Sequence, residues 1–322
     1  MLRNVVGVLV GLVGAVAMAG FGLHAQTVPV AKAPVGSALD VLRVQGNVYM
    51  IAGAGSNITV QVGPDGVVVV DAGSGQQTPA VLAAIKALCD QPIRFVIDTG
   101  GDADHVGGNE ALAKVGRSFG RGGPPIVAHE HILMRMSAPT GQSSPYPDAA
   151  MPSETFLDKK HMYLNGEGIQ IDHQPAAHSD GDITVYFRRS DVVAVGELLD
   201  MTRFPVIDVA HGGSIEGEIA ALNRLVDLAI PPTPLIWQEG GTKIIPAHGH
   251  IAEQAEVVEY RDMVTIVRDV IQDLIKKGLT LEQIKTAAPA KAYARRYGST
   301  SGPWTTDMFV EAVYTSLTVK KK

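Results

Sequence analysis

The order of apolar and polar segments most constrains the fold, because one order occurs twice along the chain. Each copy has a β-type run, an amphipathic helical pattern, a second β-type run and a polar loop with histidine. The segments are 57–73, 78–90 and 94–100 in the first copy, and 191–197, 215–229 and 242–250 in the second. Two such halves predict an α/β fold with two sheets and outer helices, rather than a doubly wound sheet.

Two further regions complete the predicted architecture. Residues 135–155 are rich in Pro, Ser and Met, and their weak periodicity predicts a long surface loop beside a binding cleft. After residue 250 the pattern becomes helical, and one apolar stripe is expected to pack against the domain. The residues of this stripe are Val257, Met263, Val267, Val270, Ile271 and Leu274.

The N-terminus has the layout of a secretory signal peptide, with Arg3 before an uncharged apolar run and then small residues. Cleavage is predicted after Ala19 or Ala25, and an uncleaved membrane anchor is the alternative. The predicted parts are a signal peptide at 1–25, a linker at 26–39, a main domain at 40–250 and a helical extension at 251–322. The folded part is therefore expected to be periplasmic or secreted, without stable membrane insertion after cleavage.

Composition excludes several classes of protein. The formal net charge of −6 argues against a nucleic-acid partner, because phosphate binding needs a basic face. The single cysteine, Cys89, excludes an intrachain disulfide framework and a Cys-rich zinc site, and it is predicted to be buried on a helix. No glycine-rich nucleotide motif follows a β-type run. A small-molecule substrate is the expected partner, and the oligomeric state is left open.

Carboxylate and imidazole side chains accumulate where the β-type runs end. They are Asp71, Asp102, Asp104, His105, His178, Asp180, Asp182, Glu197 and His248. Loops at one sheet edge can converge on a single cleft, where binding sites usually form. Three imidazoles and several carboxylates in such a cleft would suit a divalent metal ion with nitrogen and oxygen ligands.

Over roughly residues 40–250 the sequence resembles the metallo-β-lactamase-fold hydrolases, above all the periplasmic members with a long helical tail. The resemblance is carried by "GGDADHVGGN", "AHSDGDITVYF", "RFPVID", "TKIIPAHG" and, in the tail, "FVEAVYTSL". It implies a metallo-β-lactamase-like domain at 40–250, built as a four-layer αββα sandwich with a C-terminal helical extension. It also implies a metal-dependent hydrolase in which one or two ions, with zinc expected, activate water.

The resemblance assigns metal ligands residue by residue. Asp104, His105 and His248 match the second metal position, and three such ligands plus water make a workable catalytic site. Asp104 then also orients the attacking water. Asp71 matches the aspartate that supports the metal loop. Glu197 stands in place of the bridging aspartate, where its longer side chain requires the loop to retreat slightly.

The first metal position departs from the family pattern, because Gly100 and Asp102 stand where two histidines belong. His178 matches the third histidine. A second ion would rest on Asp102, His178 and Glu197, and this harder ligand set shifts the preference from zinc towards manganese, iron or magnesium. Asp102 is either such a ligand or a general base.

The other histidines are assigned to supporting or surface roles. His129 and His131 have the alternate spacing of one strand face, and they are expected near the ligands or at the surface. His250 is expected to be solvated, with a role as a substitute ligand as the alternative. The proposed substrate is a small ester, lactone, thioester or amide. The alternatives are a non-catalytic binding scaffold and an iron-dependent enzyme of redox or sulfur chemistry.

Overall fold

The structure is a computed structural model that describes residues 39–137, 142–233 and 240–318. The predicted signal peptide (1–25) and the predicted linker (26–39), except Leu39, lie outside these residues. In the part that is described, no helix has the length and apolar character needed to cross a membrane. The proposed boundary between the main domain and the helical extension remains a prediction.

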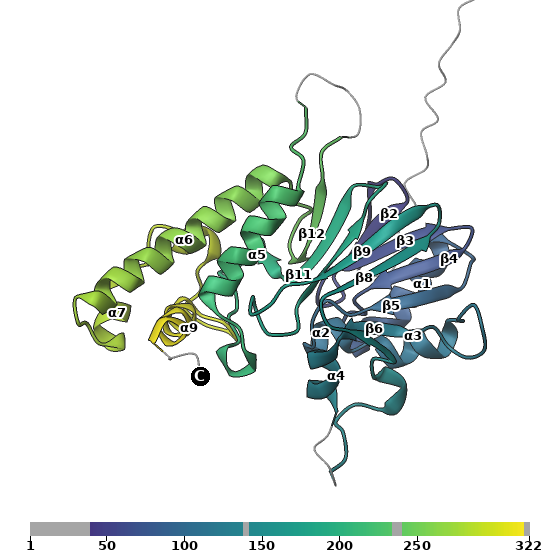
Figure 1. The fold of residues 1–322 in the computed structure, drawn as a ribbon, viewed down its shortest axis with the longest axis horizontal. Coiled ribbons are helices and arrows are strands. Elements are labelled where there is room, and N and C mark those ends of the chain that lie inside the picture. The colour runs from purple at the N-terminus through teal and green to yellow at the C-terminus, as the bar shows by residue number, and fades with distance from the viewer. Residues whose placement is uncertain (1–38, 138–141, 234–239, 319–322) are drawn as a thin grey trace, which may run out of the picture. The chain divides into compact units, whose positions relative to one another are not determined.

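The first sheet has seven strands that lie side by side in chain order (Figure 1). They are β1 Asp40–Gln45, β2 Val48–Ala52, β3 Ile58–Gly63, β4 Gly66–Val70, β5 Ile93–Ile97, β6 Ile126–His129 and β7 Glu154–Phe156. The first four strands are antiparallel, whereas β4 to β7 run parallel. Only Pro64 and Asp65 separate β3 from β4, as a hairpin turn requires.

The second sheet has five strands in the order β12-β11-β10-β9-β8. They are β8 Lys159–Leu164, β9 Glu167–His173, β10 Ile183–Phe187, β11 Val192–Asp200 and β12 Lys243–His248. Neighbours are antiparallel except for β11 and β12, which are parallel. Each sheet therefore contains the parallel pair joined through a helix that the repeated segment order predicts, β4 to β5 in the first sheet and β11 to β12 in the second.

The helices cover the outer faces of the two sheets. They are α1 Thr78–Leu88, α2 Ala103–Val106, α3 Asn109–Val115, α4 Glu130–Met136, α5 Ile215–Leu228, α6 Gln254–Lys276, α7 Leu281–Ala287, α8 Ala294–Tyr297 and α9 Thr306–Thr318. Buried side chains of α1 and α3 pack on the first sheet, and those of α5, α6 and α9 pack on the second. Figure 1 shows the ribbons of α5 and α6 beside the second sheet.

Strand β4 shows why the layers form. Its side chains point alternately to opposite faces, and all of them are buried. Val67 and Val69 join the cluster beneath α1, whereas Val68 and Val70 join the cluster between the sheets. Both faces of the sheet are thus covered, which explains the uninterrupted run of valines. The predicted αββα sandwich with C-terminal helices is confirmed.

Three local expectations are wrong and one is partly wrong. The loop expected at 135–155 overlaps α4, which extends to Met136, and β7, which begins at Glu154. His131 lies in α4, so it does not share a strand face with His129. Val270 is 40% exposed, since it lies on the solvent side of α6. Cys89 is only partly buried, because it follows the last turn of α1 rather than lying within it.

Candidate metal centre

The short helix α2 and its N-cap, which follow β5 after a short loop, carry three of the metal-binding candidates. Asp102 stands at the N-cap of α2, but its side chain makes no capping hydrogen bond there. Asp104 lies in the first turn and His105 lies one residue further on, fully buried. A simple helix-capping turn therefore does not explain why these side chains occur here.

His105 is fixed by an aspartate behind it. Its Nδ1 lies 3.1 Å from Asp71 Oδ2, and Asp71 also accepts hydrogen bonds from the amide of Thr99 (2.8 Å) and the Thr99 hydroxyl (2.7 Å). Asp71 has a left-handed backbone with φ +62°, which directs the end of β4 into this contact. The outer nitrogen, Nε2, is left facing Glu197, as in many metal-binding histidines.

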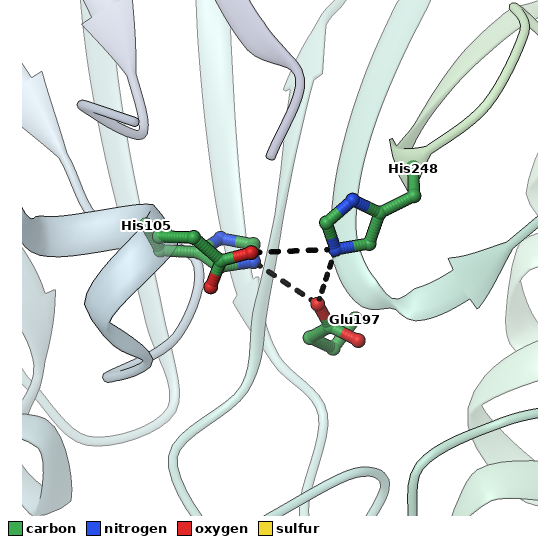
Figure 2. Close-up of side chains that lie close together, drawn as sticks. His105, Glu197 and His248 are labelled. Atoms are coloured by element: carbon green, nitrogen blue, oxygen red, sulfur yellow. Dashed lines mark hydrogen bonds and ion pairs between the residues drawn. The ribbon is translucent and has the colours of Figure 1, made fainter. Parts of the chain in front are cut away.

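Glu197 enters the site from β11 at a local irregularity in the strand. Gly196 has φ +53°, and a Cβ there would lie 2.4 Å from the Thr99 hydroxyl, so only glycine fits. Glu197 Oε1 lies 3.3 Å from His105 Nε2 and 3.1 Å from His248 Nε2 (Figure 2). The longer carboxylate thus reaches both imidazoles from within the strand.

Four donor side chains meet at this point. Atoms of Asp104, His105, Glu197 and His248 all lie within 4.8 Å of one another, and Asp104 Oδ2 is 3.4 Å from His248 Nε2. Among the residues that the structure describes, this is the one group of three or more such side chains. Two imidazole nitrogens and two carboxylates form a ligand set that suits zinc and also accommodates manganese or iron.

The electrostatics of this group favour a bound cation. Burial opposes a charged His105, yet Asp71 and Glu197 outweigh burial and raise the pKa of His105 well above its usual value. Burial also disfavours the Glu197 carboxylate, yet hydrogen bonds from His105 and His248 hold the pKa of Glu197 well below its usual range. Because the Glu197 carboxylate is held ionised and positive charge is favoured at His105, the residues fit a divalent ion.

Asp102 and His178 lie apart from this group and contact each other. His178 Nδ1 is 2.9 Å from the carbonyl oxygen of Val206, and Nε2 is 3.2 Å from Asp102 Oδ2. No third donor joins them among the described residues, and Gly100 adds none. His250 also lies outside the donor group and is paired with Glu256 at 2.7 Å.

Sequence analysis did not single out Arg203, although it lies in the quoted "RFPVID" stretch. Its guanidinium makes an ion pair with Asp200 and lies 3.9 Å from Glu197 Oε1. Because Asp200 ends β11 beside His248 of β12, the arginine reaches the site from the same sheet edge. A cation placed three residues after the carboxylate that ends a β-type run is the signal that could have indicated it.

Three comparisons with known proteins bear on this site. A linear primary-alkylsulfatase from Pseudomonas sp. (strain ATCC 19151) is 22% identical over 260 residues, which are 69% of this chain and 47% of that protein. A metallo-beta-lactamase structure from Pontibacter korlensis aligns with a TM-score of 0.54 and 19% identity, covering 70% of this chain and 99% of that one. The sec-alkylsulfatase Pisa1 from Pseudomonas sp. aligns with a TM-score of 0.59 and 16% identity, covering 86% of this chain and 50% of that one.

These matches differ in what they show. The solved structures share the fold, and the chain spans about half the length of the two alkylsulfatases. The family model of the metallo-beta-lactamase superfamily matches residues 44–232, more than half of the chain. This chain therefore belongs to the metallo-beta-lactamase superfamily.

Proposed function

We propose that this protein is a metal-dependent hydrolase of a small ester, lactone, thioester or amide, and that it holds one ion at a partly altered dinuclear site. The convergence of Asp104, His105, Glu197 and His248 carries the proposal. The alkylsulfatase relatives add a sulfate ester to the candidate substrates. We further propose that the chain is exported to the periplasm or secreted.

In the proposed hydrolase, each residue around the metal site has a separate role. A divalent ion held there supplies a Lewis acid that lowers the pKa of water and polarises the bond under attack. Asp104, at the start of α2, contacts His248 and can also orient the attacking water. Asp71 and Thr99 hold His105 in one ring orientation, which keeps the donor group assembled without substrate.

Asp102 is the proposed proton acceptor. Its side chain is 46% exposed, so solvent and substrate can reach one carboxylate oxygen while Oδ2 contacts His178. His178 is in turn fixed through Val206, so the pair has a defined orientation. This arrangement favours an acid–base role for Asp102 over a role as a ligand.

The test separates metal binding from turnover. The purified chain is analysed for zinc, manganese and iron, and it is then assayed against an aryl ester, a lactone, a thioester, a β-lactam and a primary alkyl sulfate. We expect about one ion per chain and chelator-sensitive hydrolysis of at least one substrate. Asp102→Ala should keep the ion and lose turnover if Asp102 is a base, and it should lose the ion if Asp102 is a ligand.

Other results would change the assignment. A chain that binds no metal and hydrolyses none of these substrates would contradict the proposal and favour a binding scaffold. Bound iron with oxygen uptake would instead favour redox chemistry. N-terminal sequencing of the mature protein tests export, because cleavage after Ala19 or Ala25 is expected.

A further inference from the structure

The segment 203–206, with the sequence RFPV, touches both halves of the site. At its first residue, the Arg203 guanidinium is paired with Asp200 and lies 3.9 Å from Glu197 Oε1. At its last residue, the carbonyl of Val206 accepts a hydrogen bond from His178 Nδ1 at 2.9 Å. A shift of this segment would therefore move groups beside the metal donors and beside His178 at once.

The C-terminal helices contact the middle of the segment through ring stacking and hydrogen bonds. The Phe204 ring is 1% exposed and stacks on Phe309 of α9, with ring centroids 4.8 Å apart and 5° between the planes. The backbone amide of Phe204 donates to the carbonyl of Tyr297 at 3.0 Å. The hydroxyl of Tyr260, on α6, donates to the carbonyl of Arg203 at 3.2 Å. Three elements of the extension thus meet one short loop.

The Tyr260 hydroxyl is the most informative of these contacts. The side chain is fully buried, and its ring already packs against Tyr297 at a centroid distance of 5.4 Å. A phenylalanine ring would fill the same space without the free-energy cost of burying a hydroxyl, so packing alone does not require the hydroxyl. The hydroxyl instead fixes the carbonyl of Arg203, the residue whose side chain faces Glu197.

We propose that Phe204 and Tyr260 are positioning residues, through which the C-terminal helices set the places of Arg203 and His178 relative to the metal donors. This inference rests on the proposed hydrolase function. Pro205 restricts the backbone between the two gripped residues, so a displacement of Phe204 is passed on rather than absorbed. Misplacement of catalytic groups by about 1 Å can lower a rate by up to about 100-fold.

The first test removes the hydroxyl alone. In the full-length, metal-loaded protein, Tyr260→Phe should lower kcat/KM about fivefold, the effect of one lost hydrogen bond, with the bound metal unchanged. Tyr314→Phe is the matched control, because Tyr314 lies in α9 and has no side-chain contact with 203–206 among the described interactions. We expect the control to keep the wild-type kcat/KM.

A double-mutant cycle tests whether Tyr260 acts through Arg203. In an Arg203→Gln background, Tyr260→Phe should cause a smaller loss of kcat/KM than in the wild type, since only the effect through His178 then remains. Equal losses in both backgrounds would show that the hydroxyl acts on general stability, and they would overturn the role assigned to Tyr260.

A readout that needs no activity separates this inference from the proposed function. With ¹⁵N-labelled histidine, Tyr260→Phe and Phe204→Leu should shift the ring resonances of His178, whereas Tyr314→Phe should not. If the wild type hydrolyses nothing, the proposed function fails while these resonances still test the positioning. Unchanged His178 resonances in Tyr260→Phe would overturn the inference even if Phe204→Leu did not fold.

Discussion

The two halves of the site have the same kind of anchor but different outer partners. His105 and His178 are each fixed at Nδ1, by Asp71 and by the Val206 carbonyl respectively, and each directs Nε2 towards a carboxylate. Around His105 three further donor side chains gather, whereas His178 meets the single carboxylate of Asp102. The scaffold thus retains the anchor of a metal-binding histidine even where the rest of the ligand set is missing.

Each half of the site has its own anchor for the histidine ring, and the segment 203–206 contacts both halves. The donor group depends on the ends of β5, β11 and β12, while His178 depends on the 203–206 segment and on the loop before β10. The ring anchors of His105 and His178 are different groups, so Gly100 and Asp102 can replace the histidines expected at the first metal position without removing the Asp71 contact that holds His105.

The largest effect is expected from removing His248, a member of the four-residue donor group that forms the retained half of the site. His248→Ala deletes one of two imidazole donors, so we expect bound metal to fall from about one ion per chain towards zero. The activity should fall roughly a thousandfold, or about 4 kcal/mol of transition-state stabilisation. His250→Ala is the control, because His250 is exposed and pairs with Glu256. Equal metal content in the two variants would contradict the ligand assignment.

The opposite experiment restores the altered half of the site, which consists of Gly100, Asp102 and His178. A Cβ at Gly100 would meet only Asp102 Oδ2, at 3.8 Å, so the backbone has room for a side chain there. Gly100→His combined with Asp102→His should supply two imidazoles beside His178 and raise the bound metal from about one to two ions per chain. Asp102→His alone should leave it near one. A double variant that still binds one ion would mean that the loop backbone has also diverged.

Weakening the support of the retained half should have a smaller effect. Asp71→Asn keeps the left-handed backbone, which asparagine tolerates, but it removes the charge behind His105 Nδ1. Metal affinity should fall about 10- to 100-fold, measured by competition with a chromogenic chelator. The metal content at saturation should remain near one ion. An unchanged affinity would show that the Thr99 hydroxyl, 3.2 Å from His105 Nδ1, suffices to orient the ring.

The layered fold could be predicted from the sequence because the spacing of apolar residues reflects which faces of a helix or strand are buried. The stripe of α6 is apolar on the face that packs, so its period identifies a helix, whereas the unbroken valines of β4 indicate a short strand buried on both faces. Val270 shows the limit of this argument. It fits the helical period, yet it lies where no element covers α6, and the position of neighbouring elements is not encoded in a local pattern.

The donor group was predictable because imidazole and carboxylate side chains that follow β-type runs are typical of a metal site. Asp104, His105, Glu197 and His248 follow β-type runs, and the structure brings them together. Asp102 and His178 were also expected together and lie in contact, but Glu197, expected as their common partner, joins the other donor group instead. Arg203 was missed, since its contacts arise from the side-by-side ends of β11 and β12.

The pH dependence of stability should distinguish the altered half by a modest amount. Burial disfavours a charged His178, but the hydrogen bond to Asp102 and the carboxylates of Asp182 and Glu197 outweigh it and raise the pKa of His178 to about 10. Since an unfolded histidine titrates near pH ~6.5, this contribution to stability is complete below pH ~6.5 and is lost as the pH rises through about 10. Asp102→Asn should therefore destabilise the chelator-treated protein at pH 6, by about 1 kcal/mol because Asp102 is partly solvated, and much less near pH 10. Urea unfolding at both pH values measures this difference.

Asp208→Asn, which breaks the more exposed pair with His211, is the matched control and should have little effect at either pH. An equal loss at pH 6 and pH 10 would mean that Asp102 stabilises the loop by packing, and that the altered half is not held together by charge.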